Sequence, residues 1–111
     1  VNVLAAKDGK DLLRLAKSRV EKEPTYENLI NLSLAYYKAK KWEDCINAAN
    51  SALELKPNDA GAYNNICTAC IQLGLYEKAI ENCNKAIAIA PNYQLAKNNL
   101  QWALDSQKQN P

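Results

Sequence analysis

The chain has 111 residues and a formal net charge of +2, so its length fits one domain and its charge is too small to indicate nucleic acid as the main partner. Histidine is absent and glycine occurs three times, which removes the commonest general base and metal ligand and leaves no glycine-rich phosphate loop. No apolar run is long enough for a membrane span. The composition therefore favours a globular domain that is not an enzyme and needs no cofactor or metal.

Apolar residues recur at three- and four-residue spacing along the chain, which is typical of amphipathic helices. One such stripe contains Leu12, Leu13, Ala16 and Val20. Helix-breaking residues separate the stripes, at Pro24, Lys40-Lys41, Pro57, Gly74 and Pro91. The pattern predicts an all-α fold of about six helices, which span residues 8–22, 25–39, 42–55, 59–73, 76–89 and 93–107.

The breaks are evenly spaced, because Pro57 and Pro91 are separated by a period of about 34 residues. When residues 26–59 are laid over residues 60–93, the segment Trp42-Glu43-Asp44-Cys45-Ile46 meets Tyr76-Glu77-Lys78-Ala79-Ile80. A fixed period of this size indicates a solenoid of stacked units, each with two helices.

The repeated unit resembles the tetratricopeptide repeat family, whose pattern is W-x2-L-G-x2-Y, then A-x3-F, then P. The matching positions are Leu29, Leu32, Ser33, Tyr36, Cys45, Ala49, Ala52 and Pro57 in the first repeat, and Tyr63, Ile66, Cys67, Cys70, Ala79, Cys83, Ala86 and Pro91 in the second. The resemblance implies an α-α solenoid, coiled as a right-handed superhelix, in which the first helix of every repeat lines a concave groove.

The resemblance covers about residues 24–107 and divides the chain. We expect a single domain over 8–107, made of an N-terminal capping helix (8–22), two repeats (26–59 and 60–93) and a C-terminal capping helix (94–107). A flexible N-terminus (1–7) and a tail (108–111) would flank it. Lys97 and Gln101 stand in columns that face the second helix of the same repeat in this family. Polar residues there indicate that no second helix follows.

Four cysteines include the pair Cys67-x-x-Cys70, which suggests zinc binding or redox chemistry. A reactive pair of this kind sits at a helix N-terminus, whereas Cys67 and Cys70 fall inside a predicted helix. All four cysteines occupy packing columns, so we expect them to be reduced, metal-free and mostly buried. Unpaired cysteines would weakly favour a reducing, cytoplasmic compartment; the localisation is otherwise unknown.

Asn31, Asn65 and Asn99 stand one full period apart, at the same point of three successive first helices. We call them the asparagine ladder. Helix stability does not require Asn in mid-helix. The resemblance places this column in the groove, where a carboxamide can bind both the C=O and the N–H of a peptide; a similar ladder lines the protein-substrate groove of a glycosyltransferase of this family. The alternative is that these amides only hydrogen-bond nearby backbone.

The resemblance assigns further residues to the groove. The expected peptide-binding set is Asn31, Asn65, Asn99, Asn64, Asn98, Leu34, Tyr37, Lys38, Thr68, Ile71 and Trp102. The inferred lining also includes Glu27, Ile30, Gly61, Gln72, Leu95 and Asp105. We expect Asn65 to be exposed, and an exposed Asn in mid-helix stabilises little, so its replacement by Ala should weaken binding about three- to tenfold and lower stability by no more than about 0.5 kcal/mol.

Family members that bind acidic chaperone tails use a basic carboxylate clamp. Its first-repeat sites hold Ile30 and Leu34 here, its third-repeat sites hold Leu95 and Asn99, and only Asn65 matches. The sequence therefore disfavours an acidic chaperone tail as the ligand.

The sequence predicts a non-catalytic protein-interaction module that binds a peptide segment of a protein partner through the asparagine ladder, without nucleic acid, metal or cofactor. Two alternatives stay open. One is an accessory repeat domain of a larger enzyme, such as a glycosyltransferase. The other is an oligomerisation element that self-associates through the ends of the solenoid.

Overall fold

The computed structural model describes residues 9–110, and these residues form helices and no strand. The helices are α1 (Gly9–Lys22), α2 (Tyr26–Lys38), α3 (Trp42–Leu55), α4 (Ala60–Gln72), α5 (Tyr76–Ile89) and α6 (Gln94–Gln109). The predicted all-α solenoid is confirmed. Helix α6 runs past the predicted end at 107, because no breaker precedes Asn110-Pro111, so residues 108 and 109 of the expected tail are helical. The expected flexible segment 1–7 lies outside the described residues.

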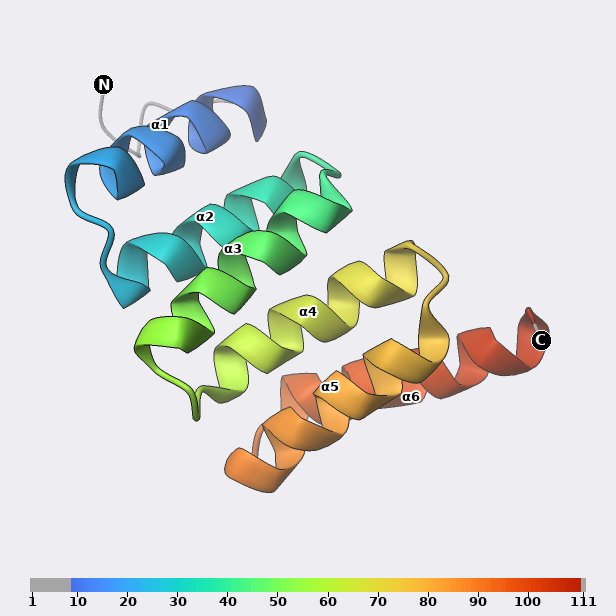
Figure 1. Cartoon of the computed structure of the whole chain (residues 1–111). Coiled ribbons are helices and arrows are strands. Elements are labelled where there is room, and N and C mark those ends of the chain that lie inside the picture. Colours follow the sequence, from blue (N-terminus) through green and yellow to red (C-terminus); the bar gives the residue numbers. More distant parts are fainter. Residues whose placement is uncertain (1–8, 111) are drawn as a thin grey trace.

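Successive helices pack on one another along a body of 43 × 27 × 21 Å (Figure 1). Helix α4 also contacts α2 on one side and α6 on the other. The first helices of successive repeats therefore lie next to each other, which is the arrangement that places a shared surface across α2, α4 and α6.

The ends of the helices follow from local chemistry. The Thr25 hydroxyl accepts a hydrogen bond from the Asn28 backbone N–H, and the Asp59 carboxylate accepts one from the Ala62 N–H at 2.8 Å. These caps begin α2 and α4. The turns within the repeats contain Lys40 with φ 61° and Gly74 with φ 77°, so both repeats break their helices with a left-handed residue at the same position.

The core is built from small side chains. The largest fully buried side chains are Cys45, Cys67, Cys70, Cys83 and Ser33. Small residues at helix contacts allow close approach of the helix axes. One apolar cluster extends from α3 to α6, and a second joins α1, α2 and α3 through Leu13, Ala16, Leu32, Ala35 and Ala48.

Cys67 of α4 and Cys83 of α5 form a disulfide, with their Cα atoms 5.5 Å apart. The expectation that all four cysteines are reduced is therefore wrong; Cys45 and Cys70 are free and buried. Cys67 occupies the column that faces the second helix of its repeat, and Cys83 lies opposite on that helix, so the two sulfur atoms meet inside the repeat. The weak inference of a reducing compartment rested on unpaired cysteines and loses its basis.

Candidate functional site

A depression of 390 Å³ lies over α2, α4 and α6, and we call it the central groove. Its lining residues are Ile30, Leu34, Tyr37, Gly61, Asn64, Asn65, Thr68, Tyr93, Leu95, Asn99 and Trp102. None of them is an Asp, Glu, Lys or Arg. The central groove is therefore an apolar and amide-rich surface that three successive first helices share.

The structure brings together most of the predicted binding residues in this groove. These are Leu34, Tyr37, Asn64, Asn65, Thr68, Asn99 and Trp102. Asn31 and Lys38 instead line a separate depression between α1 and α2. Asn98 is exposed on α6, where its side-chain oxygen accepts a hydrogen bond from Gln94 at 2.9 Å.

Ile71 does not reach the central groove. Its side chain is 5% exposed and belongs to the apolar cluster that extends from α3 to α6. We therefore leave Ile71 out of the candidate site. Thr68, three residues before Ile71, lies at the groove. Its hydroxyl donates a hydrogen bond to the backbone carbonyl of Asn65 at 2.9 Å.

The asparagine ladder joins successive repeats. The Asn65 side chain donates to the Ser33 hydroxyl of α2 at 3.4 Å, and the Asn99 side chain donates to the Asn64 side-chain oxygen of α4 at 2.9 Å. The residue one period after Ser33 is Cys67, which is bonded to Cys83. Asn99 therefore lacks the hydroxyl that Asn65 uses, and it bonds Asn64 instead.

Asn65 is 8% exposed, so the premise that it is an exposed residue is wrong. Its hydrogen bond to Ser33 is part of a buried network, because the Ser33 hydroxyl lies 2.9 Å from the Cys45 carbonyl and donates to it. A carboxamide offers two N–H donors and one carbonyl acceptor. The bond to Ser33 uses one N–H, which leaves the second N–H and the carbonyl oxygen as bonding capacity at the groove.

Aromatic side chains line the groove on α2 and on α6. The Tyr37 ring packs edge-on against Trp42, with centroids 5.0 Å apart, and its hydroxyl accepts a hydrogen bond from Gln72 at 3.2 Å. Trp102 is 39% exposed, and the neighbouring Leu34 and Leu95 are 43% and 54% exposed. These side chains form an apolar surface that is open to a ligand.

Tyr93 lies just before α6 and was not predicted from the sequence as a lining residue. Burial and the nearby charge of Asp59 raise the pKa of the Tyr93 phenol, against the opposing effect of a hydrogen bond with Asn64. Tyr93 is therefore neutral near pH 7, and the groove carries no ionised lining side chain. Its position in a loop, outside the helical period, is why the repeat pattern could not find it.

A solenoid of two-helix units that repeat at a fixed period, with a groove across its first helices, defines the class of helical-repeat proteins. The tetratricopeptide repeat pattern matches residues 26–59 and 60–93. The chain belongs to the tetratricopeptide repeat family.

The chain is similar to known members of this family. It is 31% identical over 94 residues to the anaphase-promoting complex subunit cut9 of Schizosaccharomyces pombe. The aligned segment covers 85% of this chain and 14% of cut9. Its fold matches the first TPR domain of human RPAP3 with a TM-score of 0.84, at 20% identity over 91% of this chain and 80% of that one. The second TPR domain of human RPAP3, solved in complex with the HSP70 peptide SGPTIEEVD, matches with a TM-score of 0.79, at 18% identity over 86% of this chain and 80% of that one.

Two findings bear on other kinds of site. In the part of the chain that the structure describes, no His, Cys, Asp and Glu side chains gather as a group of three or more that could hold a metal ion. None of the described helices is both long and apolar enough to cross a lipid bilayer.

Proposed function

We propose that this chain is a protein-interaction module whose central groove holds an extended, largely uncharged segment of a partner protein. The observation that carries the proposal is the chemistry of the groove, in which exposed Leu34, Leu95 and Trp102 lie beside side-chain amides and no lining residue is charged. Apolar walls with a few oriented polar groups suit a ligand that buries side chains and presents its main chain. The HSP70 peptide held by the related RPAP3 domain supports a peptide as the ligand.

In this proposal the ladder acts through Asn65 and Asn99. Each donates one N–H within the protein and keeps its other N–H and its oxygen for the peptide main chain. Asn64 is 3% exposed and orients Asn99. Two such contacts at about 0.5–1.5 kcal/mol each are small beside the roughly 8 kcal/mol that micromolar affinity requires. The apolar walls must therefore supply most of the affinity.

The charge of the ligand tests this proposal. The probes are the peptide SGPTIEEVD, its neutral analogue with both Glu→Gln, Asp→Asn, an acetylated N-terminus and an amidated C-terminus, and an array of uncharged ten-residue peptides rich in Leu, Val and Phe. We expect uncharged peptides to bind more tightly than SGPTIEEVD, with an affinity that changes less than about twofold between low and high salt. Salt-sensitive preference for the acidic peptide, or an array without an uncharged binder, would contradict the proposal.

Substitutions on α6 locate the binding surface. Leu95→Ala and Trp102→Ala should each weaken the best uncharged peptide by about fivefold or more, since exposed aromatic and aliphatic anchors dominate peptide affinity. Leu104→Ala is the matched control, because Leu104 is 36% exposed on the same helix and does not line the groove. Equal losses for all three variants would place the peptide elsewhere.

The two alternative functions stay predictions. The chain spans 14% of the length of its relative cut9, and a role as the accessory domain of a larger protein is compatible with binding in the central groove. Self-association through the ends of the solenoid is a different use of the fold, and a mass that does not rise with protein concentration would argue against it.

A further inference from the structure

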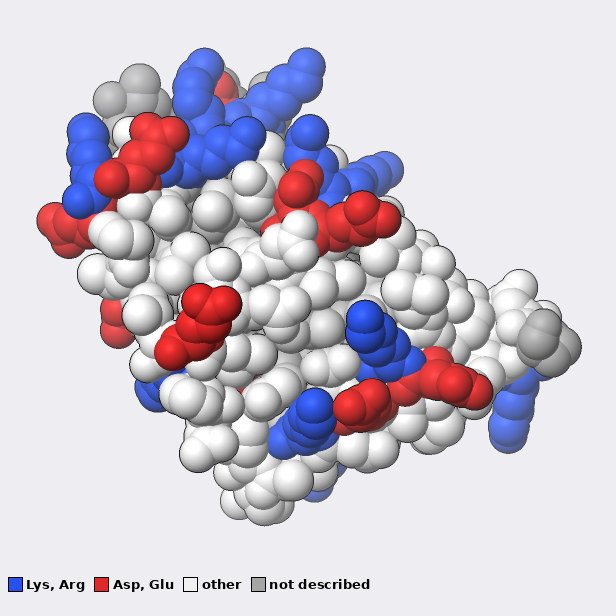
Figure 2. All heavy atoms as spheres, viewed as in Figure 1, with Lys and Arg blue, Asp and Glu red and all other residues white. Residues whose placement is uncertain are grey.

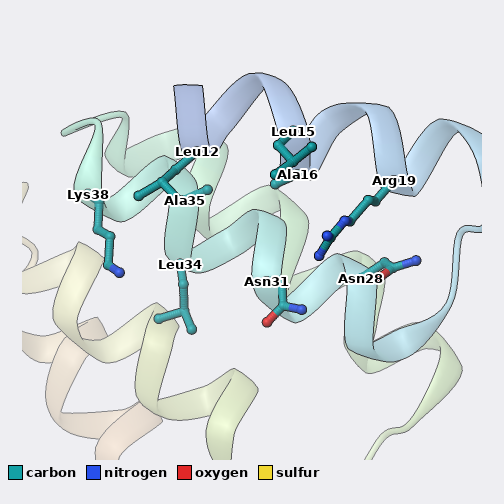
Figure 3. A pocket seen from close by; sticks show the side chains of 9 residues that line it. All are labelled: Leu12, Leu15, Ala16, Arg19, Asn28, Asn31, Leu34, Ala35 and Lys38. Atoms are coloured by element: carbon teal, nitrogen blue, oxygen red, sulfur yellow. The ribbon is translucent and has the colours of Figure 1, made fainter. Parts of the chain in front are cut away.

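A second depression, of 240 Å³, lies between α1 and α2, and we call it the end groove. Its lining residues are Leu12, Leu15, Ala16 and Arg19 from α1, and Asn28, Asn31, Leu34, Ala35 and Lys38 from α2. Figure 3 shows the α1 side chains reaching toward α2, and Asn31, Leu34 and Lys38 projecting in one common direction from α2. The end groove shares only Leu34 with the central groove.

Helix α1 has the place of the second helix of a repeat. Both α1 and α3 are 14 residues long, and their first residues, Gly9 and Trp42, are one residue short of a full period apart. Pro24 and Pro57 keep the same offset. With this offset, Leu13 aligns with Ile46, and each of these residues belongs to one of the apolar clusters. The first helix that would complete this repeat is not among the described residues.

The α2 side of the end groove is the surface that a preceding first helix contacts. Asn31 and Lys38 lie one period before Asn65 and Gln72 of α4. Both of these α4 residues donate hydrogen bonds to α2, Asn65 to Ser33 at 3.4 Å and Gln72 to Tyr37 at 3.2 Å. Asn31 and Lys38 are exposed, and neither makes a side-chain hydrogen bond to another residue in the described part of the chain.

We propose that the end groove binds an amphipathic α-helix of a partner protein, which lies on α1 and α2 as α2 lies on α3 and α4. The bound helix continues the repeat interface. It places a small residue against α1, because Ser33 of α2 and Cys67 of α4 are fully buried at that position. It also presents a hydroxyl or amide oxygen to Asn31.

Charge adds a third requirement for the bound helix. The end groove is lined by two cations, Arg19 and Lys38, and by no carboxylate. Lysine and arginine side chains also gather over α1 at this end of the molecule, with Asp and Glu side chains among them (Figure 2). A carboxylate on the bound helix therefore complements the rim of the groove.

A second copy of this chain is a poor occupant. Among the described helices, α6 is the first helix that no second helix of its own repeat covers, but Gln101 stands there in the position of Ser33 and Cys67 and is too large for it. Asp105 of α6 stands two periods after Tyr37 and would meet the charge requirement. The size of Gln101 is therefore the mismatch that favours a helix from a partner of different sequence.

A stapled peptide that copies α2 (Tyr26–Lys38) provides the probe, because α2 fills the corresponding place on α3 and α4. Within the protein, Gln72 of α4 donates a hydrogen bond to Tyr37 of α2, and Lys38 stands one period before Gln72. Residue 37 of the bound peptide should therefore lie opposite Lys38 of the protein, and the change Tyr37→Glu in the peptide places a carboxylate there. Titration into the whole ¹⁵N-labelled chain should shift the Asn31 side-chain amide and the backbone amides of Leu12, Leu15 and Arg19. The amides of Thr68 and the indole of Trp102 should not move.

Two control peptides and three protein variants decide the outcome. One control peptide adds Ser33→Gln to the probe, and the other carries Tyr37→Lys in place of Tyr37→Glu; each should bind at least tenfold more weakly. In the protein, Leu15→Glu should do the same, and Leu95→Glu in the central groove should leave binding unchanged. Asn31→Leu changes an exposed residue whose side chain makes no hydrogen bond within the described residues. It should weaken binding about threefold, and it covers the case in which Leu15→Glu fails to fold.

Three results would overturn the proposal. They are shifts confined to the central groove, unchanged affinity for both Leu15→Glu and Asn31→Leu, and the absence of any shift at millimolar peptide. If the chain forms a dimer in solution and the probe peptide dissociates that dimer, the end groove binds a second copy of this chain instead.

Discussion

Ser33 is a fully buried hydroxyl that connects three helices. It accepts a hydrogen bond from Asn65 of α4 and donates one to the Cys45 carbonyl of α3. Buried polar groups of this kind are almost always paired, because an unpaired one costs free energy. One serine therefore couples the first repeat to the second.

Removal of the Asn65 amide should destabilise the protein. We expect Asn65→Ala to lower the free energy of unfolding by about 1 kcal/mol, since it deletes a hydrogen bond to a buried hydroxyl. The matched variant Asn31→Ala removes the exposed residue of the same column and should change stability by less than about 0.5 kcal/mol. Urea unfolding measures both, and equal losses would mean that the bond to Ser33 contributes nothing.

The turns at Lys40 and Gly74 allow a reciprocal test of backbone strain. Lys40 has φ 61°, which a residue with a Cβ adopts at a cost, whereas Gly74 has φ 77° and no Cβ. Lys40→Gly should therefore raise the free energy of unfolding by about 0.5–1 kcal/mol, and Gly74→Ala should lower it by about 1 kcal/mol. A Cβ at residue 74 would meet no atom within 4 Å, so steric overlap cannot explain a loss. Thermal unfolding measures both variants. A higher melting temperature for Lys40→Gly and a lower one for Gly74→Ala would confirm that the left-handed backbone conformation causes the difference.

At the scale of helices, the Cys67–Cys83 bond ties α4 to α5 within one repeat. Denatured protein without reductant should react with two equivalents of a thiol reagent, from Cys45 and Cys70, and with four after reduction. Burial raises the pKa of both free thiols, so native protein should react slowly. Four equivalents without reductant would contradict the disulfide.

Loss of the disulfide should lower stability. Its partners are 16 residues apart, and closing a loop of this size contributes about 3 kcal/mol through the entropy of the unfolded chain. Reductant should therefore move the urea midpoint of the native protein to lower concentration. A variant with Cys67→Ala and Cys83→Ala is the control, because its midpoint should not respond to reductant.

The repeat period explains how much of this structure could be predicted. Breaks at Pro57, Gly74 and Pro91 set the helices, and column positions placed Asn65 and Trp102 at one groove. Single columns could not show which side chains meet across helices, so the pairs Asn65–Ser33 and Asn99–Asn64 and the disulfide were missed. A comparison of the two columns that face each other within a repeat would have placed Cys67 opposite Cys83 and predicted the disulfide. The capping roles of residues 8–22 and 94–107 stay predictions.

At the scale of the whole molecule, half-buried phenols make stability depend on alkaline pH. Burial, a hydrogen bond to Asp59 and its charge raise the pKa of Tyr26 above its usual value of 10.0, and burial and Asp59 raise the pKa of Tyr93. The unfolded chain then releases these protons first, so the contribution of the two phenols to stability is fully present below about pH 10 and is lost as the pH rises further.

The pH dependence can be measured as a urea midpoint between about pH 7 and pH 11. The midpoint should begin to fall near pH 9, the usual thiol pKa of Cys45 and Cys70, and fall more steeply above pH 10. The variant with Tyr26→Phe and Tyr93→Phe should show a smaller slope above pH 10. A slope equal to that of the native protein would show that these phenols do not carry the effect.

The disulfide also fixes how far the molecule extends under mechanical load. When the chain is pulled from its ends, force passes through the bond between Cys67 and Cys83 and bypasses the residues between them. At about 3.4 Å per extended residue, the 16-residue separation removes roughly 50 Å from the fully stretched length. The turn at Gly74 lies inside this bypassed segment, so it bears no tension after complete unfolding. A reducing buffer restores the missing length, which makes the stretched molecule a direct gauge of its oxidation state.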